Sequence, residues 1–135
     1  MARGGDRVSD APYLALVVAH YRHPLNHRTL AAPTHAHEGT NPLCGDRMRI
    51  ELAVREGTIA DAGFQASACA IATASASLLT ERVRGATVAE AAAIGEEAVL
   101  SSLGAGVPVP RRACATLPLR VLREALARGE GAGAS

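Results

Sequence analysis

A short segment with alternating apolar and polar residues limits the fold more than any other feature of this chain. Between residues 47 and 55 every second residue is apolar, and most of the residues between them are charged. A period of two predicts an antiparallel strand with one buried and one solvent-facing side. Glu56-Gly57 predicts a turn, and residues 58–66 predict the returning strand, in which Asp61 and Gly63 fit the pattern poorly.

Helical patterns flank this predicted hairpin. The predicted helices run from Pro12 to Tyr21, from Ala70 to Arg84, from Val88 to about Leu100, and from near Cys114 to Thr116 onward. Gly85 follows the second helix as a C-terminal cap, and Thr87 with Glu90 forms a capping-box pattern at the start of the third. The order predicts an α+β fold, a small antiparallel sheet with helices packed on one face.

The core must be built without large rings, because the chain has two Tyr, one Phe and no Trp. We therefore expect closely packed Ala, Val, Leu and Ile, with the last helix buried through Leu119, Leu122 and Leu126. Small residues of the Ala-rich helix, Ser75, Ser77 and Thr80, are interpreted as packing residues. The length fits one domain over residues 11–128, between a disordered N-terminus at 1–10 and a flexible tail at 129–135.

Charge and cysteine content limit the location and the partners of the chain. The formal net charge is +1, which gives no indication of nucleic-acid or membrane contact. No stretch reaches the roughly 20 apolar residues that span a bilayer, so we expect a cytoplasmic protein. Its 3 cysteines are an odd number, and in a reducing compartment they stay reduced rather than forming disulfides.

The cysteines share one property, which is that each lies where two predicted elements meet. Cys44 precedes the first strand, Cys69 precedes the Ala-rich helix and Cys114 precedes the last helix. Such positions can present side chains at one edge of a scaffold, and a helix N-terminus favours the thiolate that binds metal or carries sulfur. Asp46 adds a carboxylate, and Gly45 lets the backbone bend between it and Cys44. The four side chains suit zinc or a cluster with one labile ligand.

Plainer interpretations remain open at several of these residues. A cysteine in an Ala-rich protein is often a small core residue, and this applies most to Cys69. The 5 histidines all lie before residue 38, where we expect a solvated loop rather than a metal-binding arm. The exception is the tract 20–24, where an imidazole of His20 or His23 could cap carbonyls at the end of the first helix. Arg111 and Arg112 either lower the pKa of Cys114 or are simply solvated.

Three motifs resemble those of the IscU/SufU/NifU N-terminal family of iron–sulfur cluster assembly proteins. They are Asn-Pro-Leu-Cys-Gly-Asp at 41–46, the Cys-initiated Ala/Ser helix at 67–81 and Arg-Arg-Ala-Cys-Ala-Thr-Leu at 111–117. The tract at 20–26 is similar to the end of the family's N-terminal helix. The resemblance implies a three-stranded antiparallel sheet, and hence one further strand within residues 30–42.

The resemblance also implies a function. It makes Cys44, Asp46, Cys69 and Cys114 the ligands of an iron–sulfur cluster or of zinc, and a cysteine desulfurase the sulfur donor. Cys44 is then the expected persulfide acceptor and Cys114 the alternative. Recipient apo-proteins or a separate downstream scaffold would take the product. The resemblance implies that this chain is itself more a scaffold than a catalyst.

The chain does not match one branch of the family throughout. IscU-type proteins carry a histidine before the third cysteine, where this chain has Ala113. SufU-type proteins lack that histidine but carry an additional segment between the second and third motifs, for which the interval here is too short. The chain therefore resembles a short SufU-like variant. Its alternative function is a zinc-dependent sulfurtransferase that relays persulfide to a separate scaffold.

Overall fold

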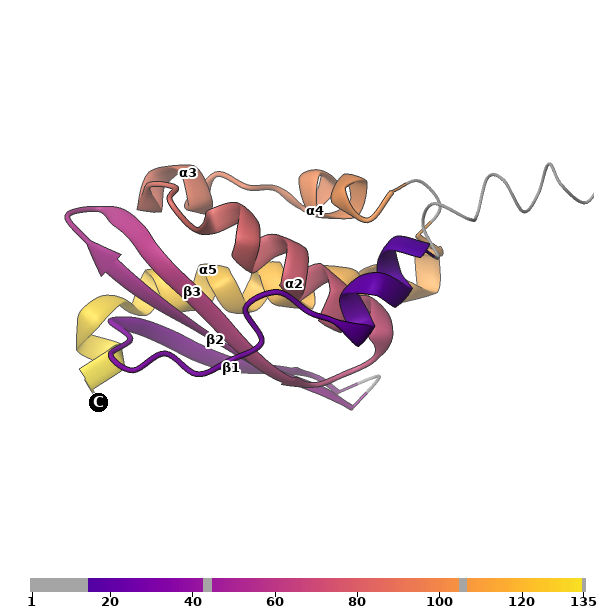
Figure 1. The fold of residues 1–135 in the computed structure, drawn as a ribbon, viewed down its shortest axis with the longest axis horizontal. Helices are drawn as coiled ribbons and strands as arrows, with labels where there is room; N and C mark the ends of the chain where they lie inside the picture. The colour runs from indigo at the N-terminus through magenta and orange to yellow at the C-terminus, as the bar shows by residue number, and fades with distance from the viewer. Residues whose placement is uncertain (1–14, 43–44, 105–106, 135) are drawn as a thin grey trace, which may run out of the picture.

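The fold is described from a computed structural model, which covers residues 15–42, 45–104 and 107–134 (Figure 1). Residues 15–22 are helical, and the predicted helix start at Pro12 and the N-terminus at 1–10 lie outside the described residues. The elements that follow are β1 (His35–Asn41), β2 (Asp46–Arg55), β3 (Thr58–Ser67), α2 (Ala70–Val83), α3 (Val88–Ala92), α4 (Glu96–Ser102), the 3₁₀ helix η1 (Val109–Arg111) and α5 (Arg112–Ala134).

The sheet has three antiparallel strands in the order β1-β2-β3, as the resemblance implied. The alternation in β2 is confirmed, because Met48, Ile50 and Leu52 are fully buried on one side of the strand. Glu56 and Gly57 both have positive φ, as a two-residue hairpin turn requires. The further strand is β1, and it lies within the predicted interval.

The helices α2 and α5 cover the same face of the sheet (Figure 1). α5 packs on β1 and β2, whereas α2 packs on β3, and the two helices contact each other. The core lies between these two layers and contains Phe64, Ile50, Leu119 and Leu122. The α+β arrangement with helices on one face is therefore confirmed.

An irregular segment crosses the opposite face of the sheet. The amide of Phe64 donates to the Asn26 carbonyl at 2.9 Å, so this segment follows β3. Leu30 is buried there, and its amide donates at 2.9 Å to the buried carboxylate of Glu51. Gly63 permits the close approach, because a Cβ at this position would lie 2.6 Å from the Arg28 carbonyl oxygen.

The single helix predicted over 88–100 is wrong, because the chain forms two short helices there. The capping box of Thr87 and Glu90 is present and starts α3 as predicted. The chain then turns through Ala93 and Ile94, which buries the Ile94 side chain in the core. Gly95 is the N-cap of the next helix, α4.

The first helix is only partly buried. Of its described stripe only Val17 is buried, whereas Val18 and Tyr21 are 44% and 51% exposed. At the other end, the backbone of α5 is helical to Ala134, and the domain end at residue 128 stays a prediction. Within the described ranges, none of the helices has both the length and the apolarity needed to cross a bilayer.

Candidate metal centre

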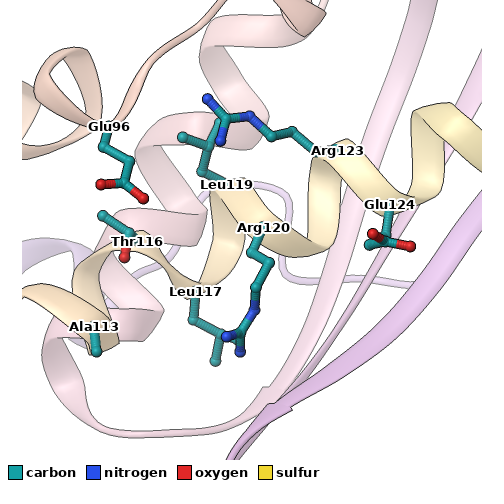
Figure 2. A pocket seen from close by; sticks show the side chains of 8 residues that line it. All are labelled: Glu96, Ala113, Thr116, Leu117, Leu119, Arg120, Arg123 and Glu124. Atoms are coloured by element: carbon teal, nitrogen blue, oxygen red, sulfur yellow. The ribbon is translucent and has the colours of Figure 1, made fainter.

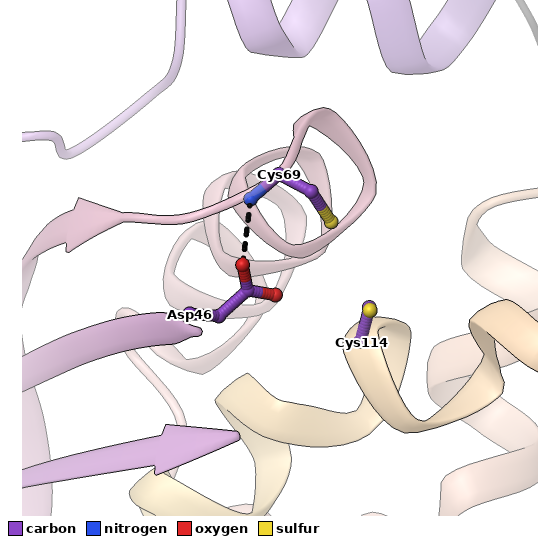
Figure 3. Close-up of side chains that lie close together, drawn as sticks. All are labelled: Asp46, Cys69 and Cys114. Carbon is purple, nitrogen blue, oxygen red and sulfur yellow. Dashed lines mark hydrogen bonds between the residues drawn. The ribbon is translucent and has the colours of Figure 1, made fainter. Parts of the chain in front are cut away.

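Three of the four predicted ligand residues meet at one end of the sheet (Figure 3). Asp46 is the first residue of β2, Cys69 is the N-cap of α2 and Cys114 lies in the first turn of α5. Their ligand atoms, one carboxylate oxygen and two sulfurs, all lie within 4.8 Å of one another. Residues far apart in sequence are thus brought to metal-binding separation by the fold.

The turn before β2 positions Asp46. Gly45 has a φ of 73°, and its amide donates to the Asn41 carbonyl at 2.8 Å, so the backbone bends sharply as predicted. Asp46 is 5% exposed, and its Oδ1 accepts a hydrogen bond from the Cys69 amide at 3.1 Å. Its Oδ2 is buried without a hydrogen-bond partner among the described residues. Figure 3 shows this oxygen on the side of the two sulfur atoms.

Cys69 occupies the N-cap of α2. Its backbone is extended, with a φ of −67° and a ψ of 168°, and its sulfur accepts from the Ala72 amide at 3.5 Å. The unpaired amides of a first helical turn favour negative charge on such a side chain. The residue is half-buried, in contrast to the fully buried Cys114.

Cys114 differs from the prediction that boundary positions expose their thiols. Its side chain is 0% exposed, because η1 and α5 carry it into the core rather than onto an edge. Nδ2 of Asn41, itself buried, donates to the Cys114 sulfur at 3.9 Å. The sequence did not predict this contact of Asn41 with Cys114. The inward orientation of the Asn41 side chain depends on the pairing of β1 with β2, whose register was not predicted.

The surroundings of these thiols separate a ligand site from ordinary core cysteines. A core cysteine packs against apolar atoms and has no need of a carboxylate beside it. Here two sulfurs lie beside a buried carboxylate oxygen that lacks a partner in the described part of the chain. A buried polar atom in that condition calls for an explanation, and a cation bound by Asp46 and the two thiols would supply one. The fourth predicted ligand, Cys44, lies outside the described residues.

The histidines take no part in this cluster. Among the described residues, Asp46, Cys69 and Cys114 make up the one group of three or more candidate ligands, and it includes no histidine. Within the described ranges, the hydrogen bond of the His20 ring is to a side chain rather than to a helix carbonyl. Its Nδ1 lies 2.7 Å from the Ser77 hydroxyl, which ties the first helix to α2.

A separate hollow of about 300 Å³ lies between α4 and α5, beside the residue that precedes Cys114 (Figure 2). Ala113 lines it, and a methyl group cannot ligate a metal. Arg123 donates to the Ile94 carbonyl at 2.9 Å and Arg120 to the Thr40 carbonyl at 2.6 Å, so both serve to hold the fold. No thiol of the described residues lines this hollow, which is therefore distinct from the candidate metal centre.

Arg111 and Arg112, next to Cys114, are both exposed. Exposure agrees with the interpretation that they are solvated. Their effect on the neighbouring thiol stays a prediction.

Comparisons with known proteins identify relatives of this chain. A model of the NifU-like N-terminal domain matches residues 12–132. The chain is 35% identical over 114 residues to the iron-sulfur cluster assembly scaffold protein IscU 1 of Archaeoglobus fulgidus, covering 84% of this chain and 74% of that protein. It is 28% identical over 139 residues to the zinc-dependent sulfurtransferase SufU of Bacillus subtilis, covering 90% and 94%.

The fold has solved counterparts. An iron-sulfur cluster assembly scaffold protein of the SUF system from Fervidobacterium islandicum AW-1 gives a TM-score of 0.73 at 22% identity, covering 87% of this chain and 98% of that one. The three-stranded sheet and helices of the present chain therefore recur in a solved protein. Because the family model spans most of the sequence, this chain belongs to the NifU-like N-terminal domain family.

Proposed function

We propose that this protein assembles iron–sulfur clusters, accepting sulfur from a cysteine desulfurase and binding iron or cluster through Cys44, Asp46, Cys69 and Cys114. The observation that carries the proposal is the Oδ2 of Asp46, which lies beside two thiols and has no hydrogen-bond partner in the described part of the chain. A cation at this point would give the oxygen a partner. The names of related proteins, including the IscU scaffold of Archaeoglobus fulgidus, support the same function.

The donor set suits a cargo that must later leave. Thiolates bind the iron of iron–sulfur clusters strongly, whereas a carboxylate is the weaker ligand in such a site. Asp46 therefore supplies the corner at which a cluster can be exchanged. The hydrogen bond from the Cys69 amide holds one carboxylate oxygen and leaves the other directed at the cargo.

Sulfur would arrive by thiol–disulfide exchange chemistry. A thiolate of this chain attacks the outer sulfur of the desulfurase persulfide, the S–S bond of that persulfide breaks, and the desulfurase cysteine leaves as thiolate. The new S–S bond makes a persulfide on this chain, with no net oxidation or reduction. Cys44 is the proposed acceptor and Cys114 the alternative. The full burial of Cys114 counts against the alternative, because a desulfurase persulfide must reach the attacking sulfur.

The surface beside Cys69 has room for a segment of the donor. A hollow of about 550 Å³ is lined by Tyr21, Arg22 and His27 from the N-terminal region and by Ala68 and Thr73, which flank Cys69 in sequence. The exposed side chains of Val18 and Tyr21 add apolar contact area to the same region of the chain. Recipient apo-proteins or a downstream scaffold would then take the assembled product.

A zinc-dependent sulfurtransferase is the second candidate. The similarity to SufU of Bacillus subtilis and the absence of a ligand side chain at Ala113 favour it. The same cysteines and Asp46 would hold zinc, which matches a tetrahedral site of sulfur and oxygen donors. Zinc would keep the thiols deprotonated until the desulfurase persulfide reaches the acceptor.

Analysis of iron, zinc and acid-labile sulfide in protein purified without oxygen tests both candidates. Iron with sulfide supports the scaffold. Zinc without sulfide, together with faster desulfurase turnover when the protein is added, supports the sulfurtransferase. The variant Cys69→Ala should lose the bound species, whereas Ser67→Ala, an exposed neighbour, should keep it. Wild-type protein that retains neither metal and forms no cluster chromophore on reconstitution contradicts both.

A further inference from the structure

One hydrogen bond joins the two helices that carry the candidate thiols. Ser75, on α2, is 1% exposed, and its hydroxyl donates to the carbonyl of Ala115 on α5 at 2.6 Å. Ala115 directly follows Cys114, and Ser75 lies on the helix that Cys69 caps. We propose that Ser75 is a positioning residue that fixes the separation of Cys69 and Cys114, an inference that rests on the proposed metal site.

The apolar packing around this contact brings α2 and α5 close together but does little to fix how the two helices are aligned. Ala72 and Ala76 of α2 lie in the same buried cluster as Cys114, and Ala74 packs with Ala115 in a second cluster. Small methyl groups let two helices approach closely, yet apolar packing by itself leaves the exact alignment weakly specified. A hydrogen bond is directional and acts over a narrow range of distances, so it fixes the relative shift of the helices.

The beginning of α5 lacks one backbone hydrogen bond of a regular helix. Pro118 lies inside α5, and a proline nitrogen has no hydrogen to donate to the helical ladder. The first turns of α5 therefore lack one of the backbone hydrogen bonds that would make them rigid. The Ser75 hydroxyl acts on this same stretch, one residue after the Cys114 thiol.

Two other buried hydroxyls of α2, those of Ser77 and Thr80, have different partners. The Ser77 hydroxyl accepts from the Leu25 amide at 2.8 Å and lies 2.7 Å from His20, so it anchors the N-terminal segment. Thr80 donates to the Ala76 carbonyl of its own helix at 2.7 Å. Of these three residues, Ser75 alone reaches α5, and Ser77 provides a control with equal burial.

The test compares Ser75→Ala with Ser77→Ala for zinc affinity, measured by competition with a chromophoric chelator. Changes in groups that orient metal ligands typically weaken affinity about 10- to 100-fold, and we expect Ser75→Ala to lose at least about tenfold. Ser77→Ala should keep wild-type affinity. Urea unfolding of both metal-free variants should show similar losses of stability. The cobalt(II) complex of Ser75→Ala should show a weaker sulfur-to-metal charge-transfer band than wild type.

The outcomes separate this inference from the proposed function. Wild-type protein that binds neither zinc nor cobalt overturns the metal site and the role of Ser75 together. Wild-type affinity in Ser75→Ala overturns the role of Ser75 alone, as does an equal loss in both variants. If Ser75→Ala does not fold, Ser75→Thr and Ser75→Val decide, because they share a shape and differ in the hydroxyl. Tighter zinc binding by the threonine variant supports the inference, and equal binding overturns it.

Discussion

Replacing Asp46 by asparagine should stabilise the metal-free protein while it weakens metal binding. Asp46 is buried, and its Oδ2 has no hydrogen-bond partner in the part of the chain that the structure describes. An unsatisfied buried acceptor costs about 1–3 kcal/mol, and more when it is charged. Asparagine keeps the oxygen that accepts from the Cys69 amide and replaces the unpartnered oxygen by a neutral NH₂ group beside two sulfurs.

The size of the effect follows from these contacts. Because the amide removes the charge but satisfies its new donors only partly, we expect a gain of about 1–2 kcal/mol in the free energy of unfolding. With a urea m value of about 2 kcal/mol/M, the midpoint should rise by roughly 0.5–1 M. Zinc affinity should fall by at least about tenfold, since even outer-shell changes have that effect.

The assays are urea unfolding of metal-free protein, followed by far-ultraviolet circular dichroism, and zinc competition with a chelator. Asp61→Asn is the matched control, because Asp61 is a partly exposed carboxylate with Arg28 as its partner. That variant should lose stability and keep zinc affinity. A metal-free Asp46→Asn protein that is less stable than wild type, with unchanged zinc affinity, would refute the reasoning.

Three further predictions concern the fold. Arg28 hydrogen-bonds Asp61 and thereby holds the pKa of that carboxyl below its usual range, so the pair stabilises the protein above about pH 4 and this contribution fades as pH falls through the lowered pKa. The urea midpoints of Asp61→Asn and wild type should therefore converge at low pH, and a constant difference would contradict this. Gly63→Ala should lose about 1–3 kcal/mol by overpacking and speed hydrogen exchange at the Phe64 amide; wild-type exchange would speak against it. Thr87→Ala should lose about 0.5–2 kcal/mol of stability in urea with no change in metal binding, and unaltered stability would show that the capping box is dispensable.

Local patterns predicted much of the fold. The alternation in β2, the turn at Glu56-Gly57 and the capping box at Thr87 each depend on residues close in sequence, and all three are present. β1 could be placed only through the family resemblance. Its sequence, His-Ala-His-Glu-Gly-Thr-Asn, has no apolar alternation, and the strand exists because it pairs with β2 and packs against α5.

Sequence patterns predicted that Asp46, Cys69 and Cys114 come together, but not how each is buried or held. Cys44 stays a predicted fourth ligand. The positions of Cys69 and Cys114 at helix starts followed from their neighbours, and the structure brings both next to Asp46. The burial of Cys114 did not follow, because it depends on how α5 packs against the sheet. The contacts made by Asn41 and Ser75 depend on the register of β1 and on the alignment of α2 with α5, which no local pattern encodes.

X-ray absorption at the zinc edge tests most directly the claim that three cysteines and Asp46 bind one ion. The protein loaded with zinc should show about three sulfurs near 2.3 Å and one oxygen at about 2.0–2.2 Å. Cys114→Ala should lose one sulfur from that shell, and Asp46→Ala should lose the protein oxygen. A zinc shell without sulfur, or a sulfur count that does not change in Cys114→Ala, would contradict the account.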